Sequence, residues 1–243
     1  MTMASQTTGI DVSHHQDSID WTKVRAAGHR FAFIKATEGA TVTDALFATN
    51  WKAARDAGLR TGAYHFFHPQ TDVAKQVENF LAAVGSRRSG DLPPVLDLEV
   101  PSEWIVAPEF DQWSKVPASE RVPRVLAWLK AVEARLGVRP IIYLSPSFAN
   151  DILANDARLA AYDLWIAHYT SASSPTVPKP WTTWLYWQFS ETGTAPGIPG
   201  KSVDLDVFNG TMLQENDQIA PASDSLMMRF FRAIKRMWQA IFA

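Results

Sequence analysis

The sequence predicts an α/β fold, an irregular (β/α)5(β)3 barrel of the TIM type. Strand-like and helix-like segments alternate along residues 9–160, which is typical of a parallel sheet built from βα units. Eight strand candidates are enough to close a barrel, and 243 residues is an ordinary length for one. A doubly wound open sheet is the alternative.

The strand candidates are short, rich in β-branched and aromatic residues, and bounded by Gly, Pro, Asp or Ser. They are Gly9–Ser13, Phe31–Thr37, Thr61–Phe67, Pro94–Val100, Pro140–Ser145, Leu164–Tyr169, Trp184–Ser190 and Val203–Phe208. Helical patterns follow the first five, several of them ending at a glycine. These are Trp21–Ala27, Asp44–Ala57, Asp72–Val84, Glu120–Leu136 and Ser147–Ala160.

The second half of the pattern is irregular. Loops rich in Pro, Ser and Gly connect the last three strands, with no helix of useful length between them. The segment Glu99–Pro123 is a long insertion that contains Trp104 and Trp113, and its aromatic content favours a functional loop over the barrel mouth.

Composition excludes several classes of function. The chain is 47% hydrophobic and 20% charged, with a net charge of -2, so it is typical of a globular protein and we expect no nucleic-acid partner. There is no cysteine, which excludes disulfides, thiolate metal sites and cysteine nucleophiles. No stretch of 18 apolar residues predicts a spanning helix.

Acidic residues mark the ends of three predicted strands. Asp97 and Glu99 are two residues apart, so their side chains lie on one face of a strand, with Cβ atoms roughly 6.5–7 Å apart. In a closed barrel the eighth strand neighbours the first, which would place Asp204 beside Asp11. Because clustered carboxyl groups cannot all ionise cheaply, some pKa values should rise, as a general acid requires. Paired carboxyl groups are the working parts of most glycosidases.

Two other interpretations of these acids stay open. Single acids at strand ends are often only capping or loop residues, and four carboxylates could instead hold Mg²⁺ or Ca²⁺. Because buried acid pairs are costly, we favour catalysis and expect neither a metal nor another cofactor.

The chain resembles the family 25 glycoside hydrolases, the muramidases of bacteria, fungi and phages. The resemblance covers roughly residues 8 to 211 and rests on an ordered set of short motifs. These are Gly9–Ser13 with Gln16, Phe33–Gly39, Gly62–Phe66, Asp97–Glu99, Leu164–Ala167, Trp187–Phe189 and Val203–Asp206.

The resemblance implies an irregular barrel that cleaves the β-1,4 bond from N-acetylmuramic acid to N-acetylglucosamine in peptidoglycan. It implies that Glu99 is the proton donor and that Asp97 stabilises the transition state or the substrate's own N-acetyl group. Asp11 and Asp204 would complete the acidic cluster, with Tyr64 lining the sugar site. The remaining residues expected at the substrate are Asp206, Trp187, Gln188, His65, Lys35 and Glu38. The stereochemical course is not decided by the spacing of the two acids.

Several of these residues also have a purely structural interpretation. His65 could be structural, Lys35 and Glu38 could form a salt bridge that shapes the site, and Trp165, Trp184 and Trp187 could be core residues or sugar platforms. His14 and His15 are adjacent, so they are expected to be ordinary loop residues and not a metal pair.

The C-terminal residues predict separate behaviour. Residues 212–225 are typical of a linker between a 1–211 catalytic barrel and residues 226–243, which form a basic amphipathic pattern with four positive charges and no acid. This pattern predicts contact with an anionic membrane or lipopolysaccharide, although a helix docked on the barrel is the alternative. Met1–Thr8 lack the features of a secretory signal. We therefore expect a monomeric phage or prophage endolysin that is released by a holin and acts on the cell wall.

Two rival functions remain. A non-catalytic peptidoglycan-binding or membrane-active barrel would not need Asp97 and Glu99 together. A chitinase would need a series of spaced acids before the glutamate, and that series is incomplete here.

Overall fold

The structure is a computed structural model that describes residues 7–101 and 111–210. It contains one nine-stranded sheet in the order β1-β9-β8-β7-β6-β5-β4-β2-β3, and the additional pairing of β1 with β2 closes eight of the strands into a barrel. The strands are β1 Thr7–Val12, β2 Phe31–Glu38, β3 Val42–Thr43, β4 Arg60–Phe66, β5 Val95–Asp97, β6 Ile141–Leu144, β7 Asp163–Ala167, β8 Tyr186–Gly193 and β9 Val203–Phe208. The predicted barrel is confirmed, and β3 is a short extra strand on β2.

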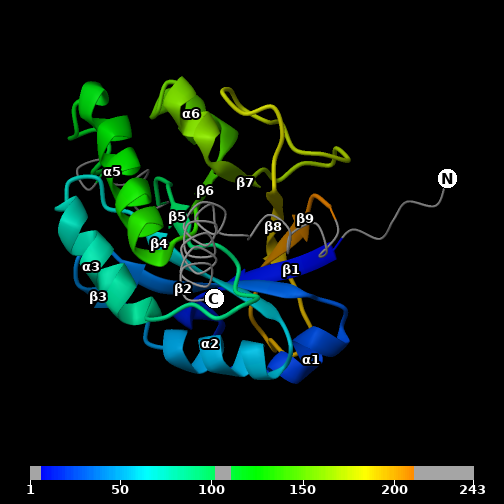
Figure 1. Cartoon of the computed structure of the whole chain (residues 1–243). Helices are drawn as coiled ribbons and strands as arrows, with labels where there is room; N and C mark the ends of the chain where they lie inside the picture. Colours follow the sequence, from blue (N-terminus) through cyan, green and yellow to red (C-terminus); the bar gives the residue numbers. More distant parts are fainter. Residues whose placement is uncertain (1–6, 102–110, 211–243) are drawn as a thin grey trace, which may run out of the picture.

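Helices cover one side of this barrel. They are α1 Trp21–Ala26, α2 Phe47–Asp56, α3 Val73–Val84, α5 Ala118–Leu136 and α6 Pro146–Asp151, with short 3-10 turns η1 His14–Gln16 and η3 Ala157–Ala161. Figure 1 shows α1, α2, α3 and α5 wrapped around β1–β5, whereas the side formed by β7, β8 and β9 carries loops. The irregular second half of the barrel therefore follows the sequence prediction.

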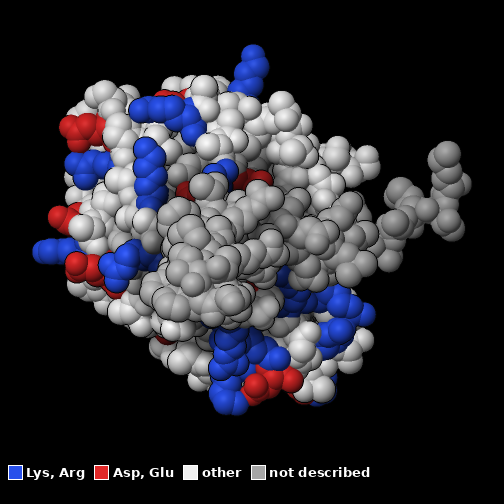
Figure 2. All heavy atoms as spheres, in the orientation of Figure 1, with Lys and Arg blue, Asp and Glu red and all other residues white. Residues whose placement is uncertain are grey.

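Local chemistry sets where the helices begin and end. The Asp72 carboxylate accepts a hydrogen bond from the Lys75 backbone N–H at 3.0 Å, which caps α3. Gly137 ends α5 in the left-handed conformation at φ 68°, which only glycine adopts without strain. On the flank formed by α3 and α5, basic side chains lie beside acidic ones (Figure 2), as in the Arg124–Glu120 ion pair at 3.0 Å.

Three predicted elements differ from the structure. The single helix expected over Ser147–Ala160 is wrong, because Ala154 and Asn155 have positive φ angles that break it into α6 and η3. α2 begins at Phe47 and not at Asp44, whose side chain instead accepts a hydrogen bond from the Leu46 N–H. The last strand, β9, runs antiparallel to both of its neighbours, so the sheet is not wholly parallel.

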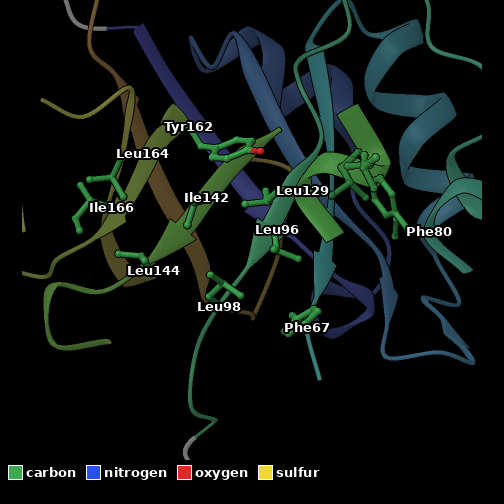
Figure 3. Packing of buried hydrophobic residues seen from close by; sticks show 14 of the residues in the cluster. Phe67, Phe80, Leu96, Leu98, Leu129, Ile142, Leu144, Tyr162, Leu164 and Ile166 are labelled. Carbon is green, nitrogen blue, oxygen red and sulfur yellow. The ribbon is translucent and has the colours of Figure 1, made fainter. Parts of the chain in front are cut away.

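Two apolar cores hold the barrel. The outer core packs alternate strand residues against the helices, and Figure 3 shows Leu96, Leu98, Ile142 and Leu144 on this side together with Leu129 of α5. The inner core fills the barrel with aromatic and aliphatic side chains: Phe31, Phe33, Leu92, Val95, Ile141, Trp165, Tyr186 and Phe208. Because Leu96 and Leu98 face the helices, Asp97 and Glu99 face the opposite side, as the spacing predicted.

Glycines make room for the largest inner rings. A Cβ atom at Gly9 would lie 2.3 Å from the Phe31 ring, and one at Gly62 would lie 2.4 Å from the Phe33 ring. Both glycines are therefore required by close packing and not by backbone conformation. The filled interior forms the floor beneath the acidic residues at one end of the barrel.

Candidate active site

Three strands bring the predicted acids to one end of the barrel. Asp11 near the end of β1 is paired in register with Asp204 near the start of β9. Asp97 is the last residue of β5, and Glu99 follows two residues later on a segment whose Leu98 N–H still bonds the Tyr143 carbonyl of the next strand. All four acids line the same pocket.

The pocket is part of a groove across the barrel mouth. Its central part measures about 270 Å³ and contains the four acids together with Tyr64. One arm of about 490 Å³ runs from the same acids towards His14, His15 and Gln112. The other, of about 810 Å³, runs from Glu99 towards Ser145, His168 and Thr176. Glu99 lines all three parts, so space for ligand extends on both sides of its carboxyl group.

Burial and mutual repulsion shift the titration of these acids. Burial, followed by the charge of Asp206, raises the pKa of Asp11. Burial also raises the pKa of Asp204 to about 9, with Asp11 adding to the effect. The pKa of Asp97 rises because of burial and then because of the nearby Glu99 carboxylate, while Lys35 opposes the rise. The cluster therefore carries protons at neutral pH that exposed acids would lose.

Asp97 has an unusual environment for a buried carboxyl group. It is 5% exposed, and its Oδ1 atom has no hydrogen-bond partner among the described residues. A buried polar atom without a partner is costly and is often completed by a ligand. Its position on the groove makes a bound substrate the natural partner.

Gln188 connects the acids to two tyrosines. Its Oε1 atom accepts hydrogen bonds from the Tyr143 hydroxyl at 2.8 Å and the Tyr169 hydroxyl at 2.7 Å. Its Nε2 atom donates to Asp11 Oδ2 at 2.8 Å. Because both tyrosines are donors, the amide can present only its N–H group to Asp11, which fixes the orientation of that carboxylate.

A charged network forms the wall of one arm. Lys35 Nζ lies 2.7 Å from Glu38 Oε2, so the predicted salt bridge is confirmed, and His68 Nε2 lies 3.0 Å from Glu38 Oε1. The hydrogen bond from His68, followed by that from Lys35, lowers the pKa of Glu38 to about 2. All three residues line the groove, so Lys35 and Glu38 combine a structural contact with access to ligand.

Three residues expected at the substrate lie away from the groove. His65 is fully buried on the helix side, between Thr37 Oγ1 at 2.7 Å and Gln76 Oε1 at 3.2 Å, and burial lowers its pKa to about 3. Trp187 is buried in the outer core. Asp206 is fully buried beneath the groove, where it accepts a hydrogen bond from Trp165 Nε1 at 2.8 Å. These positions do not fit direct contact with a sugar.

Other residues of the groove were not predicted. Tyr143 follows the inward-facing Ile141 by two positions, so the strand period could have identified it. Tyr169 and Glu191 lie on loops and strand ends whose course the sequence does not reveal. His14 and His15, expected to be ordinary loop residues, also line the groove. Trp113 is fully buried and donates to the Glu99 carbonyl at 3.0 Å, which anchors the backbone of that acid.

The described residues contain no group of three or more His, Cys, Asp or Glu side chains arranged to hold a metal ion. Among the same residues, no helix is long and apolar enough to cross a membrane.

Comparisons with known proteins agree with this geometry. The family model of glycosyl hydrolases family 25 matches residues 10–198. Lysozyme M1 of Streptomyces globisporus is 36% identical over 211 residues, which cover 84% of this chain and 68% of that protein. An N,O-diacetylmuramidase of Arthroderma benhamiae is 32% identical, over 88% of this chain and 86% of its own length.

Solved structures give the same result. The bacterial lysozyme of Streptomyces coelicolor is 35% identical, with a TM-score of 0.81 and coverage of 89% of this chain and 98% of that one. A family GH25 lysozyme of Aspergillus fumigatus is 29% identical, with a TM-score of 0.78, over 88% and 99% of the two chains. The predicted family is thereby confirmed: the chain is a glycoside hydrolase and belongs to glycosyl hydrolases family 25.

Proposed function

We propose that this glycoside hydrolase is a muramidase, which cleaves the β-1,4 bond between N-acetylmuramic acid and N-acetylglucosamine in peptidoglycan. The observation that carries the proposal is the placement of Glu99 at the junction of all parts of the groove. A glycan strand along this groove would have sugar rings on both sides of Glu99, as an enzyme that cuts within a strand requires. The names of the related lysozymes and muramidases support the same substrate.

Glu99 acts as the general acid in this proposal. It protonates the oxygen that links the two sugars, so that the bond to the anomeric carbon breaks and the leaving sugar departs as an alcohol; water then adds to the anomeric carbon and loses a proton, which leaves a new reducing end. The Glu99 side chain is half-buried at the groove, and its backbone is held by Trp113. This anchoring limits the positions from which the proton can be delivered.

Asp97 stabilises the positive charge that develops on the sugar ring, or the substrate's N-acetyl group acting as an internal nucleophile. In the second case the unpartnered Oδ1 atom would accept a hydrogen bond from the acetamido N–H and turn its carbonyl oxygen towards the anomeric carbon. Asp11 and Asp204 shape the opposite wall, and Tyr64, whose pKa burial raises, stays a neutral phenol beside the sugar.

The decisive experiment measures reducing ends released from purified peptidoglycan. We expect Glu99→Gln to lose at least about 100-fold in rate, since general acid catalysis alone contributes roughly 10²–10⁴-fold. Mass spectrometry of the wild-type products should find N-acetylmuramic acid at the reducing end. Equal release by wild type and Glu99→Gln would instead support a non-catalytic wall-binding barrel, and N-acetylglucosamine at the new end would contradict the muramidase assignment.

We also propose, from the sequence, that residues 226–243 contact anionic lipid or lipopolysaccharide. These residues, like the linker at 212–225, lie outside the described part of the chain, and the proposal rests on their pattern of basic and apolar side chains in the sequence. Removal of residues 224–243 should abolish leakage from anionic vesicles while activity on purified wall stays the same. Unchanged leakage and unchanged lysis of intact cells would contradict this contact.

A further inference from the structure

A second pocket lies at the end of the barrel opposite to the groove. It measures about 290 Å³ and is bounded by the start of β7, the segment before β8 and the residue after β9. Its lining includes three aromatic residues, Tyr162, Trp181 and Trp184, together with Asp163, Thr183 and Asn209. The volume is at the lower limit of ligand pockets, which are roughly 300–1,000 Å³, and suits one sugar ring.

Two polar side chains of this pocket, those of Asp163 and Trp184, have no hydrogen-bond partner among the described residues, whereas Asn209, Thr183 and Trp181 bond within the fold. The Asp163 side chain, at an exposed position, forms no hydrogen bond or ion pair with the described residues; desolvation by the surrounding protein raises the pKa of its carboxyl group, and the charge of Arg139 opposes this rise. The indole N–H of Trp184 is likewise unbonded within the described ranges, whereas the Trp181 indole donates to the Tyr162 carbonyl at 2.8 Å. A donor and an acceptor therefore remain available beside aromatic surface.

Neighbouring contacts hold these groups in place. Asn209 Nδ2 donates to the Trp184 carbonyl at 2.9 Å, which ties the segment after β9 to the segment before β8. The Trp184 ring packs at 6.0 Å from the Trp187 ring in an edge-to-face arrangement. Trp184 is half-buried by this packing, so one part of the ring is fixed while the rest lines the pocket.

We propose that this pocket binds a pyranose ring of a second, uncut glycan strand of the wall. Aromatic rings pair with the apolar faces of pyranoses, and a carboxylate beside them can accept hydrogen bonds from two sugar hydroxyl groups. The inference rests on the proposed function for the nature of the polymer, and it adds a holding site to the cutting site.

The second pocket and the groove lie at opposite ends of β7. Asp163 begins β7, and Ala167 at the other end of that strand lines the groove. Five residues of strand span about 13 Å, at roughly 3.3 Å per residue. A glycan that lies along the groove runs across one end of the barrel and the second pocket opens at the other end, so the proposal assigns the second pocket to a neighbouring strand.

The test measures retention on insoluble peptidoglycan by sedimentation, with every chain carrying Glu99→Gln to prevent cutting. We expect Asp163→Ala and Trp184→Ala each to raise the apparent Kd by about tenfold, which corresponds to about 1.4 kcal/mol and is within the range for one lost hydrogen bond. The matched control is Glu78→Ala, which removes an exposed acid on α3, far from both sites in sequence and contacts. Melting curves establish whether each variant is folded. Asp163 is at an exposed position, so Asp163→Ala still tests the pocket if Trp184→Ala does not fold.

A second readout separates the two proposals. With Glu99 restored, Asp163→Ala should leave kcat/KM on short soluble glycan fragments unchanged, because such fragments need only the groove. Equal retention of the Asp163→Ala, Trp184→Ala and Glu78→Ala chains would overturn the second site even if peptidoglycan is cut. Conversely, absence of cutting by the wild type would defeat the proposed function, while the sedimentation comparison would still decide whether the pocket binds glycan.

Discussion

Replacement of Asp204 by Asn should stabilise the protein while it impairs catalysis. The folded state holds the pKa of this carboxyl group at about 9, far above its ordinary value of 3.8, mainly because of burial and then because of Asp11. The native state therefore binds a proton that the unfolded chain releases between these two pH values. Because the native state binds the extra proton, the contribution of Asp204 lowers the free energy of unfolding as pH rises from about 4 to 9.

The magnitude follows from the same shift. Each pKa unit corresponds to about 1.4 kcal/mol, so the full shift sets an upper limit of about 7 kcal/mol above pH 9 and of about 4 kcal/mol at pH 7. The groove is open to water and Asp204 is only partly buried, so we expect a gain of about 1–2 kcal/mol at pH 7. For a chain of this size that gain corresponds to about 2–8 °C in Tm. Asparagine keeps the shape of the side chain and can donate to Asp11.

Thermal unfolding of wild type and Asp204→Asn at several pH values tests this reasoning. The difference in Tm should be small near pH 4 and should grow towards pH 8, while release of reducing ends falls. Glu78→Gln, which removes an exposed acid, should show no such pH-dependent gain. A lower Tm for Asp204→Asn at pH 8, or the same difference at both pH values, would refute the argument.

Three further predictions follow from the cores and the groove. His65→Ala should lower the free energy of unfolding by about 2–4 kcal/mol in denaturant titrations, because it leaves a cavity and unpaired hydrogen-bond partners, while KM stays unchanged. A raised KM without loss of stability would indicate that His65 contacts the substrate. Gly9→Ala should lower the free energy of unfolding by about 1–3 kcal/mol, since its Cβ would meet the Phe31 ring, and Phe31→Leu in the same chain should recover part of this loss. Additive losses of the two substitutions in urea titrations would contradict the packing argument. Gln188→Leu should reduce kcat/KM at least about tenfold, because Asp11 loses the donor that orients it, and a wild-type rate would show that this contact is not needed.

The sequence predicted the barrel and the carboxylates because both depend on short-range periodicity. The two-residue spacing of Asp97 and Glu99 determines that they share a face, and the apolar Leu96 and Leu98 determine which face it is. The neighbourhood of Asp11 and Asp204 was predicted from closure of the sheet, and the register confirms it, but the pairing also depends on the antiparallel direction of β9, which the sequence did not predict. Neither conclusion needed the loops to be known.

The misplaced residues show where periodicity is insufficient. His65 was assigned to the substrate site because it follows the motif of Tyr64, but neighbours on a strand face opposite sides, and His65 faces α3 and α5. Trp187 and Gln188 are also neighbours on one strand and face opposite sides, so Trp187 lies in the outer core and only Gln188 faces the groove. The left-handed conformation at Ala154, which interrupts the predicted fifth helix, has no signal in an alanine side chain.

The reversed direction of β9 determines where the described chain can be extended. In an all-parallel barrel the eighth strand would finish beside the catalytic acids, whereas here β9 starts there and its last residue, Phe208, pairs with Thr7 at the first residue of β1. The entry and exit of the barrel are therefore neighbours, on the side remote from the cleavage site. Fusion partners, immobilising tags or a short peptide that joins these two points in a circular permutant would leave the catalytic groove unobstructed, although they would lie beside the second pocket.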